Sequence, residues 1–264
     1  MNRKSTALSV VLGLIGLGLH GWAKSSGFTH GTRLPIPQNP VWLALLIFTL
    51  LVPLLALLLA LPLRRCKPEE PQNLYSSATL VGRTIGVLGG LFLLAGSLFA
   101  GAELLRVMQF QPSAGGIVPL LIHLLLVIAG VVMLVTAFRA PSHVPGAQVM
   151  VPGFAVAFLL IQFYHSHAQD PVLEHYCWVL LGLMALALGL CLSAGYAFRL
   201  FHPFWTYVCL FTAGAWCLAA SISASEIGYS AMLVGFALWC FWLCDLTVCH
   251  TCPPGAREEN PERI

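Results

Sequence analysis

Three histidines and two acids are concentrated in the segment FYHSHAQDPVLEHY (163–176), in a chain of which only 9% is charged. His165 and His167 are two residues apart, and His175 follows later in the same segment. Imidazole nitrogens completed by a carboxylate would suit zinc or another divalent cation. A further imidazole lies in an upstream apolar run. The candidate metal ligands are His123, His165, His167, Asp170 and His175.

The same segment also has the pattern of a helix boundary. Asp170 is a good N-cap residue, and Pro171 suits the first helical position, where no backbone N–H is needed. Glu174 would then complement the helix dipole. Because H-x-H is a weak metal pattern, spacing alone favours this structural interpretation over a metal site.

A second candidate site lies near the C-terminus, in the motif CHTC. Cys249, His250 and Cys252 are soft metal ligands, and Cys66 in RRCK could join them. A single C-x-x-C without a matched partner is typical of free thiols as well. Phosphate-binding, serine-hydrolase and zinc-protease motifs are absent, so no catalytic residue is predicted, and a divalent metal is the one cofactor considered.

The composition identifies the environment in which these residues must be positioned. The chain has 264 residues, 58% of them hydrophobic, and a mean hydropathy of +0.86. Soluble domains are about 45–50% apolar and about 25% charged. We therefore expect lipid to surround most of the chain. The net charge of +3 gives no indication of a nucleic-acid partner.

Eight apolar runs approach or exceed the roughly 17–25 residues that a helix needs to cross a bilayer. They are 5–23, 41–63, 78–102, 116–138, 148–164, 171–198, 203–222 and 227–248. The predicted fold is an all-α, polytopic transmembrane bundle forming a single domain, 1–248. Residues 249–264 are expected to form a disordered cytoplasmic tail, because they are rich in Pro and Glu.

The basic residues predict how the chain is threaded, because cytoplasmic loops are enriched in Lys and Arg. With both termini cytoplasmic, the inner side holds ten of the 13 basic residues: Arg3, Lys4, Arg64, Arg65, Lys67, Arg83, Arg139, Arg199, Arg257 and Arg263. The outer side holds Lys24, Arg33 and Arg106. The histidine-rich segment is then on the outer side.

The first run has an alternative interpretation as a signal peptide, with Gly21 and Ala23 as small residues before a cleavage site. The bulky Trp22 and the length of the run favour a retained helix. Cleavage would leave seven spans without changing the orientation of the others.

Small and polar residues mark two further features of the spans. Gly82, Gly86 and Gly90 recur every fourth residue and predict a close helix contact, within the chain or in a homodimer. His123, Glu103 and Glu226 belong to the outer half and are candidates for an outer cavity. No acidic or basic residue lies at the centre of a span, which argues against a proton-coupled pump.

The stretch FYHSHAQDPVLEHYCWVLL resembles the transmembrane protein 45 family of eukaryotes, which carries an aromatic-H-x-H turn before a long apolar helix. The matching positions are Phe163, Tyr164, His165, His167, Leu173 and His175. GLIGLGLHGWAKS and His123 also look similar to positions in that family. The resemblance implies a eukaryotic multi-pass membrane protein without a settled activity, located in the plasma membrane or in secretory or endosomal membranes. It also implies a functional role for the histidines.

Three functions are compatible with these observations. The predicted one is an accessory or structural membrane protein, whose partners are the lipid bilayer and another membrane protein or a second copy of the chain. The alternatives are a permease or channel for a small solute, and an outer-face metal-binding sensor or enzyme.

Overall fold

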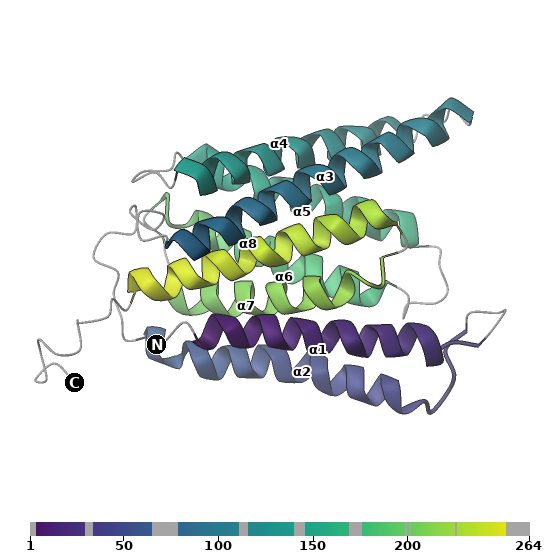
Figure 1. Ribbon diagram of the computed structural model, residues 1–264, viewed down its shortest axis with the longest axis horizontal. Helices are drawn as coiled ribbons and strands as arrows, with labels where there is room; N and C mark the ends of the chain where they lie inside the picture. The colour runs from purple at the N-terminus through teal and green to yellow at the C-terminus, as the bar shows by residue number, and fades with distance from the viewer. Residues whose placement is uncertain are drawn as a thin grey trace, which may run out of the picture.

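The chain forms a bundle of α-helices whose axes run side by side (Figure 1). The computed structural model describes residues 4–29, 34–64, 79–110, 116–139, 146–168, 176–198, 200, 202–224 and 226–251. The helices in these ranges are α1 (Lys4–Ser26), α2 (Pro40–Ala60), η1 (Leu61–Arg64, a 3-10 helix), α3 (Leu80–Phe110), α4 (Ile117–Arg139), α5 (Gly146–His167), α6 (Cys177–Ala194), α7 (Pro203–Ala220) and α8 (Ile227–Thr251).

The last two helices form the centre of the bundle. α8 packs on α3 and α7, while α7 also packs on α6, α1 and α2. α3 to α6 form a continuous series in which each helix packs on the next. Figure 1 shows α7 and α8 between the α3–α4 pair and the α1–α2 pair. The start of α1 and the end of α8 lie at the same end of the bundle.

The pattern of buried residues explains which helices are central. In α2 the buried residues recur every three or four positions and form one stripe, as expected for a helix with a single packed face. They are Val41, Leu45, Phe48, Val52, Ala56 and Ala60. In α7 most residues from Phe204 to Ala220 are buried, so this helix is covered over most of its surface, although Trp205 is exposed. The outward leucines of α2 are left exposed to the surrounding medium.

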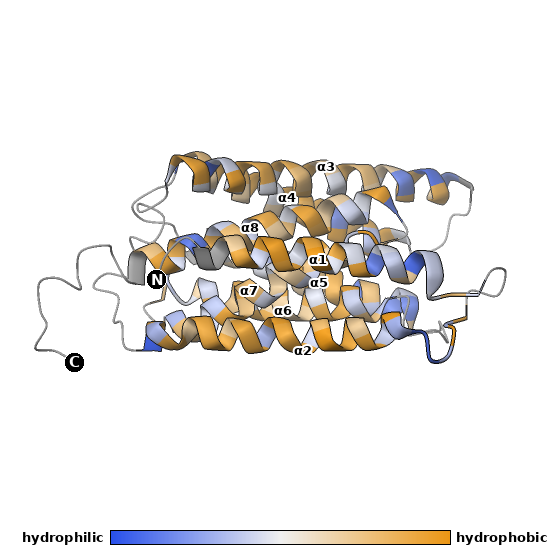
Figure 2. Ribbon diagram, turned by 60° about the horizontal axis from the view of Figure 1, so that its bottom comes forward, coloured by the Kyte–Doolittle hydropathy of each residue, from blue (hydrophilic) through white to orange (hydrophobic). Residues whose placement is uncertain are grey.

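Seven of the described helices are long and apolar enough to cross a membrane, by length and composition. Figure 2 shows hydrophobic residues along the helices and hydrophilic residues gathered near their ends. α5 is not among the seven. It contains Gln148 and Gln162 and ends with His165 and His167, which make it less apolar than its neighbours.

Several helix boundaries differ from those expected from hydropathy. α3 continues to Phe110 and α5 to His167, so polar residues end the apolar run without ending the helix. α6 ends at Ala194, although the apolar run continues to Phe198. The chain turns back at Gly195, whose carbonyl accepts a hydrogen bond from the backbone N–H of Leu200. A Cβ at Gly195 would lie 2.4 Å from the Leu200 carbonyl oxygen, so this turn requires glycine.

The expected glycine face of α3 is covered within the chain. A Cβ at Gly86 would lie 2.7 Å from the ring of Trp242 in α8, and one at Gly90 would lie 3.0 Å from the backbone of Leu134 in α4. Gly82 also faces Trp242. This face is therefore filled by α4 and α8 and is not a free surface for a homodimer.

The closest approach of α3 to α8 uses a different set of glycines, Gly89 and Gly96 in α3 with Gly228 and Gly235 in α8. A Cβ at Gly235 would lie 2.6 Å from the backbone nitrogen of Leu93, and one at Gly96 would lie 2.7 Å from the carbonyl oxygen of Gly228. The two glycines of each helix are seven residues apart, about two turns, so they lie on one face. Small residues at such positions let two helix backbones come together in a membrane.

α1 is an integral part of the bundle. The Ser9 hydroxyl donates to the carbonyl oxygen of Phe211 in α7 at 3.0 Å. A Cβ at Gly16 would lie 2.4 Å from the ring of Phe48 and 2.6 Å from Ala219. α1 thus fills a space between α2 and α7.

Candidate functional site

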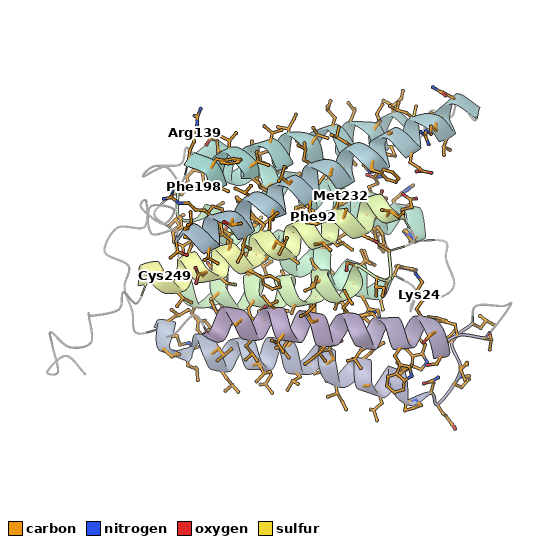
Figure 3. All side chains as sticks on the ribbon, viewed as in Figure 1. Lys24, Phe92, Arg139, Phe198, Met232 and Cys249 are labelled. Carbon is orange, nitrogen blue, oxygen red and sulfur yellow. The ribbon has the colours of Figure 1, made fainter. Side chains whose placement is uncertain are left out.

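The candidate site lies at one end of the bundle, which we name the Lys24 end. At this end α1, α3, α5 and α7 finish, and α2, α4, α6 and α8 begin. Figure 3 shows Lys24 there, whereas Arg139, Phe198 and Cys249 lie toward the opposite end. The outer side predicted from the basic residues corresponds to the Lys24 end.

His123 is the most deeply placed of the predicted site residues. Its side chain is only 3% exposed, and it lies two turns into α4, with Gly101 of α3 against its Cβ. The Nδ1 atom is 2.8 Å from the carbonyl oxygen of Pro119. Because a carbonyl only accepts, Nδ1 must carry the hydrogen. Nε2 is buried and has no hydrogen-bond partner among the residues that the structure describes.

Tyr229 contacts His123, and Gln162 in turn contacts Tyr229. The ring of Tyr229 in α8 packs edge-on against the imidazole, with centroids 5.8 Å apart. Gln162 of α5 donates from Nε2 to the Tyr229 hydroxyl oxygen at 3.5 Å. The Gln162 Oε1 atom is also buried and lacks a partner in the described part of the chain. We call His123, Gln162 and Tyr229 the His123 cluster.

Aromatic rings extend this cluster toward the end of α5. Phe163 lies 6.3 Å from Tyr229 by ring centroids and stacks on His167 at 4.3 Å. His167 in turn lies 5.2 Å from Tyr176. The Nδ1 atom of His167 donates to the Phe163 carbonyl oxygen at 2.9 Å, which fixes the ring against this aromatic group.

The two histidines of the H-x-H motif have different environments. Both belong to the last turn of α5 rather than to a loop. Residues two apart on an α-helix point in widely different directions, since each residue turns the helix by about 100°. His167 accordingly packs inward, whereas His165 is exposed. The structure does not bring His165 to the His123 cluster.

The other predicted site residues are placed as follows. Asp170 and His175 lie outside the described residues, and Glu103 and Glu226 are exposed at the Lys24 end. Within the described ranges, no group of three His, Cys, Asp or Glu side chains could hold a metal ion. Neither Tyr229 nor Gln162 was identified as a site residue from the sequence. The only feature of the sequence that could have indicated them is the position of Gln162, a polar residue inside an apolar run.

A second buried histidine lies at the same end. His20 of α1 is 3% exposed, and its Nδ1 atom is 3.0 Å from the Ser223 hydroxyl. Its ring packs edge-on against Trp178 at 5.2 Å. One turn further on, the Lys24 ammonium donates to the carbonyl oxygen of Ile222 at 3.2 Å. These contacts fasten α1 to the end of α7 and to α6.

The cysteine-rich candidate lies at the opposite end. Cys249 is in the last turns of α8, with its Sγ atom 4.0 Å from the Asp245 carboxylate. Cys66, Cys252 and the side chain of His250 are outside the described part of the structure. The predicted C-x-x-C metal site therefore stays a hypothesis.

The fold defines this chain as a multi-pass membrane protein, since its described part contains seven helices long and apolar enough to cross a bilayer. Comparison with protein-family models, curated proteins and solved structures finds no match.

Proposed function

We propose that the chain crosses the membrane eight times, with both ends in the cytoplasm. α5 has 22 residues and packs between α4 and α6. At about 1.5 Å per residue it is about 33 Å long, enough for a hydrocarbon core of about 30 Å. The packing of α1 in the bundle supports a retained first helix. The distribution of Lys and Arg supports the orientation.

This threading makes a direct prediction for reporter tags. Tags fused to the N- and C-termini of the full chain should both be protected in sealed cells and both become accessible when the plasma membrane is permeabilised. A tag inserted between Thr29 and Leu34, at the α1–α2 connection, serves as the control. It should be accessible in sealed cells where the protein is in the plasma membrane, and should stay protected after permeabilisation of the plasma membrane where the protein is in an internal membrane. Terminal tags on opposite faces of the membrane would contradict an even number of crossings.

We further propose that the protein is an accessory or structural membrane protein rather than a solute pathway. The supporting observation is the filled centre of the bundle. The side chains of Tyr207, Phe211, Phe236, Phe241 and Trp242 are all fully buried there. No Asp, Glu, Lys or Arg is among the fully buried side chains of the described residues. Ion and proton pathways usually use such groups.

The filled centre also weighs against the permease or channel alternative. A solute path requires a continuous polar or hydrated route, and large aromatic side chains occupy the middle of this bundle. The His123 cluster is confined to the region near the Lys24 end. This position is better suited to a site that opens to one side of the membrane than to a path through the membrane.

Co-purification tests the accessory role. Full-length protein extracted from its native membrane in a mild detergent should carry another membrane protein in fixed stoichiometry. The association should involve the outward faces of the helices, because the glycine face of α3 is already filled. A strictly solitary monomer, obtained repeatedly under conditions that preserve known membrane complexes, would contradict this function.

Similarity to the transmembrane protein 45 family remains part of the proposal. The inward packing of Phe163 and His167, two of the residues that carry the resemblance, supports it.

A further inference from the structure

The His123 cluster contains two buried hydrogen-bond acceptors with no donor facing them. Since Nδ1 of His123 donates to Pro119, Nε2 has a lone pair and no hydrogen in the neutral form of the ring. Oε1 of Gln162 is the second acceptor, because the Nε2 atom of the same amide donates to Tyr229. Neither atom has a partner among the described residues. Buried polar atoms are rarely left without a partner, so the cluster is suited to a ligand that donates more than one hydrogen bond.

The surroundings of these two acceptors favour a cationic donor. The ring of Tyr229 lies beside the His123 imidazole, the ring of Phe163 lies beside Tyr229, and aromatic faces attract ammonium groups. Glu226 lies three residues before Tyr229 at the start of α8, and Glu103 lies two residues after Gly101 in α3; both are exposed at this end. Arg106 and Lys24 are also exposed there, but Lys24 is held by the Ile222 carbonyl.

The depth of the cluster matches that of a lipid headgroup. Tyr229 lies two residues inside the start of α8, Gln162 five residues from the end of α5, and His123 six residues from the start of α4. At about 1.5 Å per residue these positions are about 3–9 Å below the helix ends. An occupant could therefore come from the outer aqueous phase or from the outer leaflet of the bilayer.

We propose that the His123 cluster binds a primary ammonium group, with His123 Nε2 and Gln162 Oε1 accepting two of its N–H hydrogens. A hydroxyl has a single hydrogen to donate and satisfies one acceptor. A primary ammonium has three N–H hydrogens and can satisfy both acceptors. The ligand is a small soluble amine or the ethanolamine headgroup of a lipid, which share this chemistry. Such binding is a function beyond the accessory role and independent of it.

The test measures thermal unfolding of the purified full chain in detergent, with ethylammonium chloride or tetramethylammonium chloride at equal ionic strength. Tetramethylammonium carries the same charge but has no N–H donor. Ethylammonium should raise the unfolding midpoint in a saturable way, and tetramethylammonium should not. Gln162→Leu keeps the side-chain size and removes the acceptor, so ethylammonium should bind about tenfold more weakly or worse. Gln109→Leu, at an exposed position of α3, should leave binding unchanged.

If Gln162→Leu does not fold, Tyr229→Phe replaces it. This variant removes the hydroxyl that holds the amide of Gln162, and it should weaken the ethylammonium response. Equal responses to the two cations, no response to ethylammonium, or a response unchanged in both variants would overturn the proposal. Equal responses to the two cations would indicate a general ion effect. No response to ethylammonium would indicate that a bound water at most occupies the cluster.

Native mass spectrometry distinguishes the two sources of the amine. Ethanolamine lipid retained by the unmodified protein and lost from Gln162→Leu would identify a lipid headgroup as the ligand. An ethylammonium response without retained ethanolamine lipid would identify a soluble amine. A zinc-induced rise in the midpoint that depends on His123, without any ethylammonium response, would replace the amine site by a metal site.

Discussion

Gly235→Leu is expected to separate α8 from α3 and to lower the free energy of unfolding by about 3 kcal/mol, at the upper end of the usual range for overpacking. The added Cβ would lie 2.6 Å from the backbone nitrogen of Leu93 and 2.8 Å from the carbonyl oxygen of Gly89. Both are backbone atoms and cannot rotate away as a side chain could. The measurement is the unfolding midpoint of the purified protein in a fixed detergent.

The control for this substitution is Gly18→Leu. Gly18 is an exposed glycine in α1, and a Cβ there would meet nothing within 4 Å. The same change in residue type should therefore leave the midpoint nearly unchanged or raise it, because glycine is a weak helix former. Equal losses in the two variants would show that the close contact of α3 with α8 does not determine the stability of the bundle.

Trp242→Ala is expected to cost about 3–5 kcal/mol, as for other large aromatic side chains removed from a packed core. Trp242 is fully buried. Its ring fills the space left by Gly82 and Gly86 of α3 and packs edge-on against Trp239 with centroids 4.7 Å apart. Truncation leaves a cavity that the glycines cannot fill. The unfolding midpoint should fall, together with the yield of folded monomer from membranes.

Trp22→Ala is the matched control, because Trp22 is 43% exposed on α1. Its loss should change the midpoint by much less than the loss of Trp242. If the two tryptophan variants were equally unstable, the central position of α8 would not account for the effect.

The helices themselves could be predicted from hydropathy, because the apolar runs approach or exceed the length that a helix needs to cross a bilayer. The run 203–222 and the helix α7 (Pro203–Ala220) agree closely at the start, where proline occupies the first helical position. Helix ends were less predictable. At Glu103 the apolar run stops while α3 continues, since a polar residue ends favourable contact with lipid but does not interrupt backbone hydrogen bonding.

The helix contacts and the site depend on information that a single sequence does not contain. The recurrence of glycine every four residues at Gly82, Gly86 and Gly90 drew attention to α3. The tightest contact with α8, however, involves Gly89 and Gly96. The sequence indicated His123, because a titratable residue inside an apolar run is unusual. Its partners in α5 and α8 could not be recognised, because their orientation depends on how α3, α4 and α8 pack together.

The central position of α7 and α8 has a consequence for biosynthesis. α7 and α8 leave the ribosome after α1 to α6, yet α1, α2, α3 and α6 all pack against one or both of them. The faces of these earlier helices that pack on α7 or α8 must therefore stay unpaired in the bilayer until the α7–α8 hairpin inserts. A chain terminated prematurely before Pro203 would lack the element around which its helices gather, and we expect cellular quality control to degrade it.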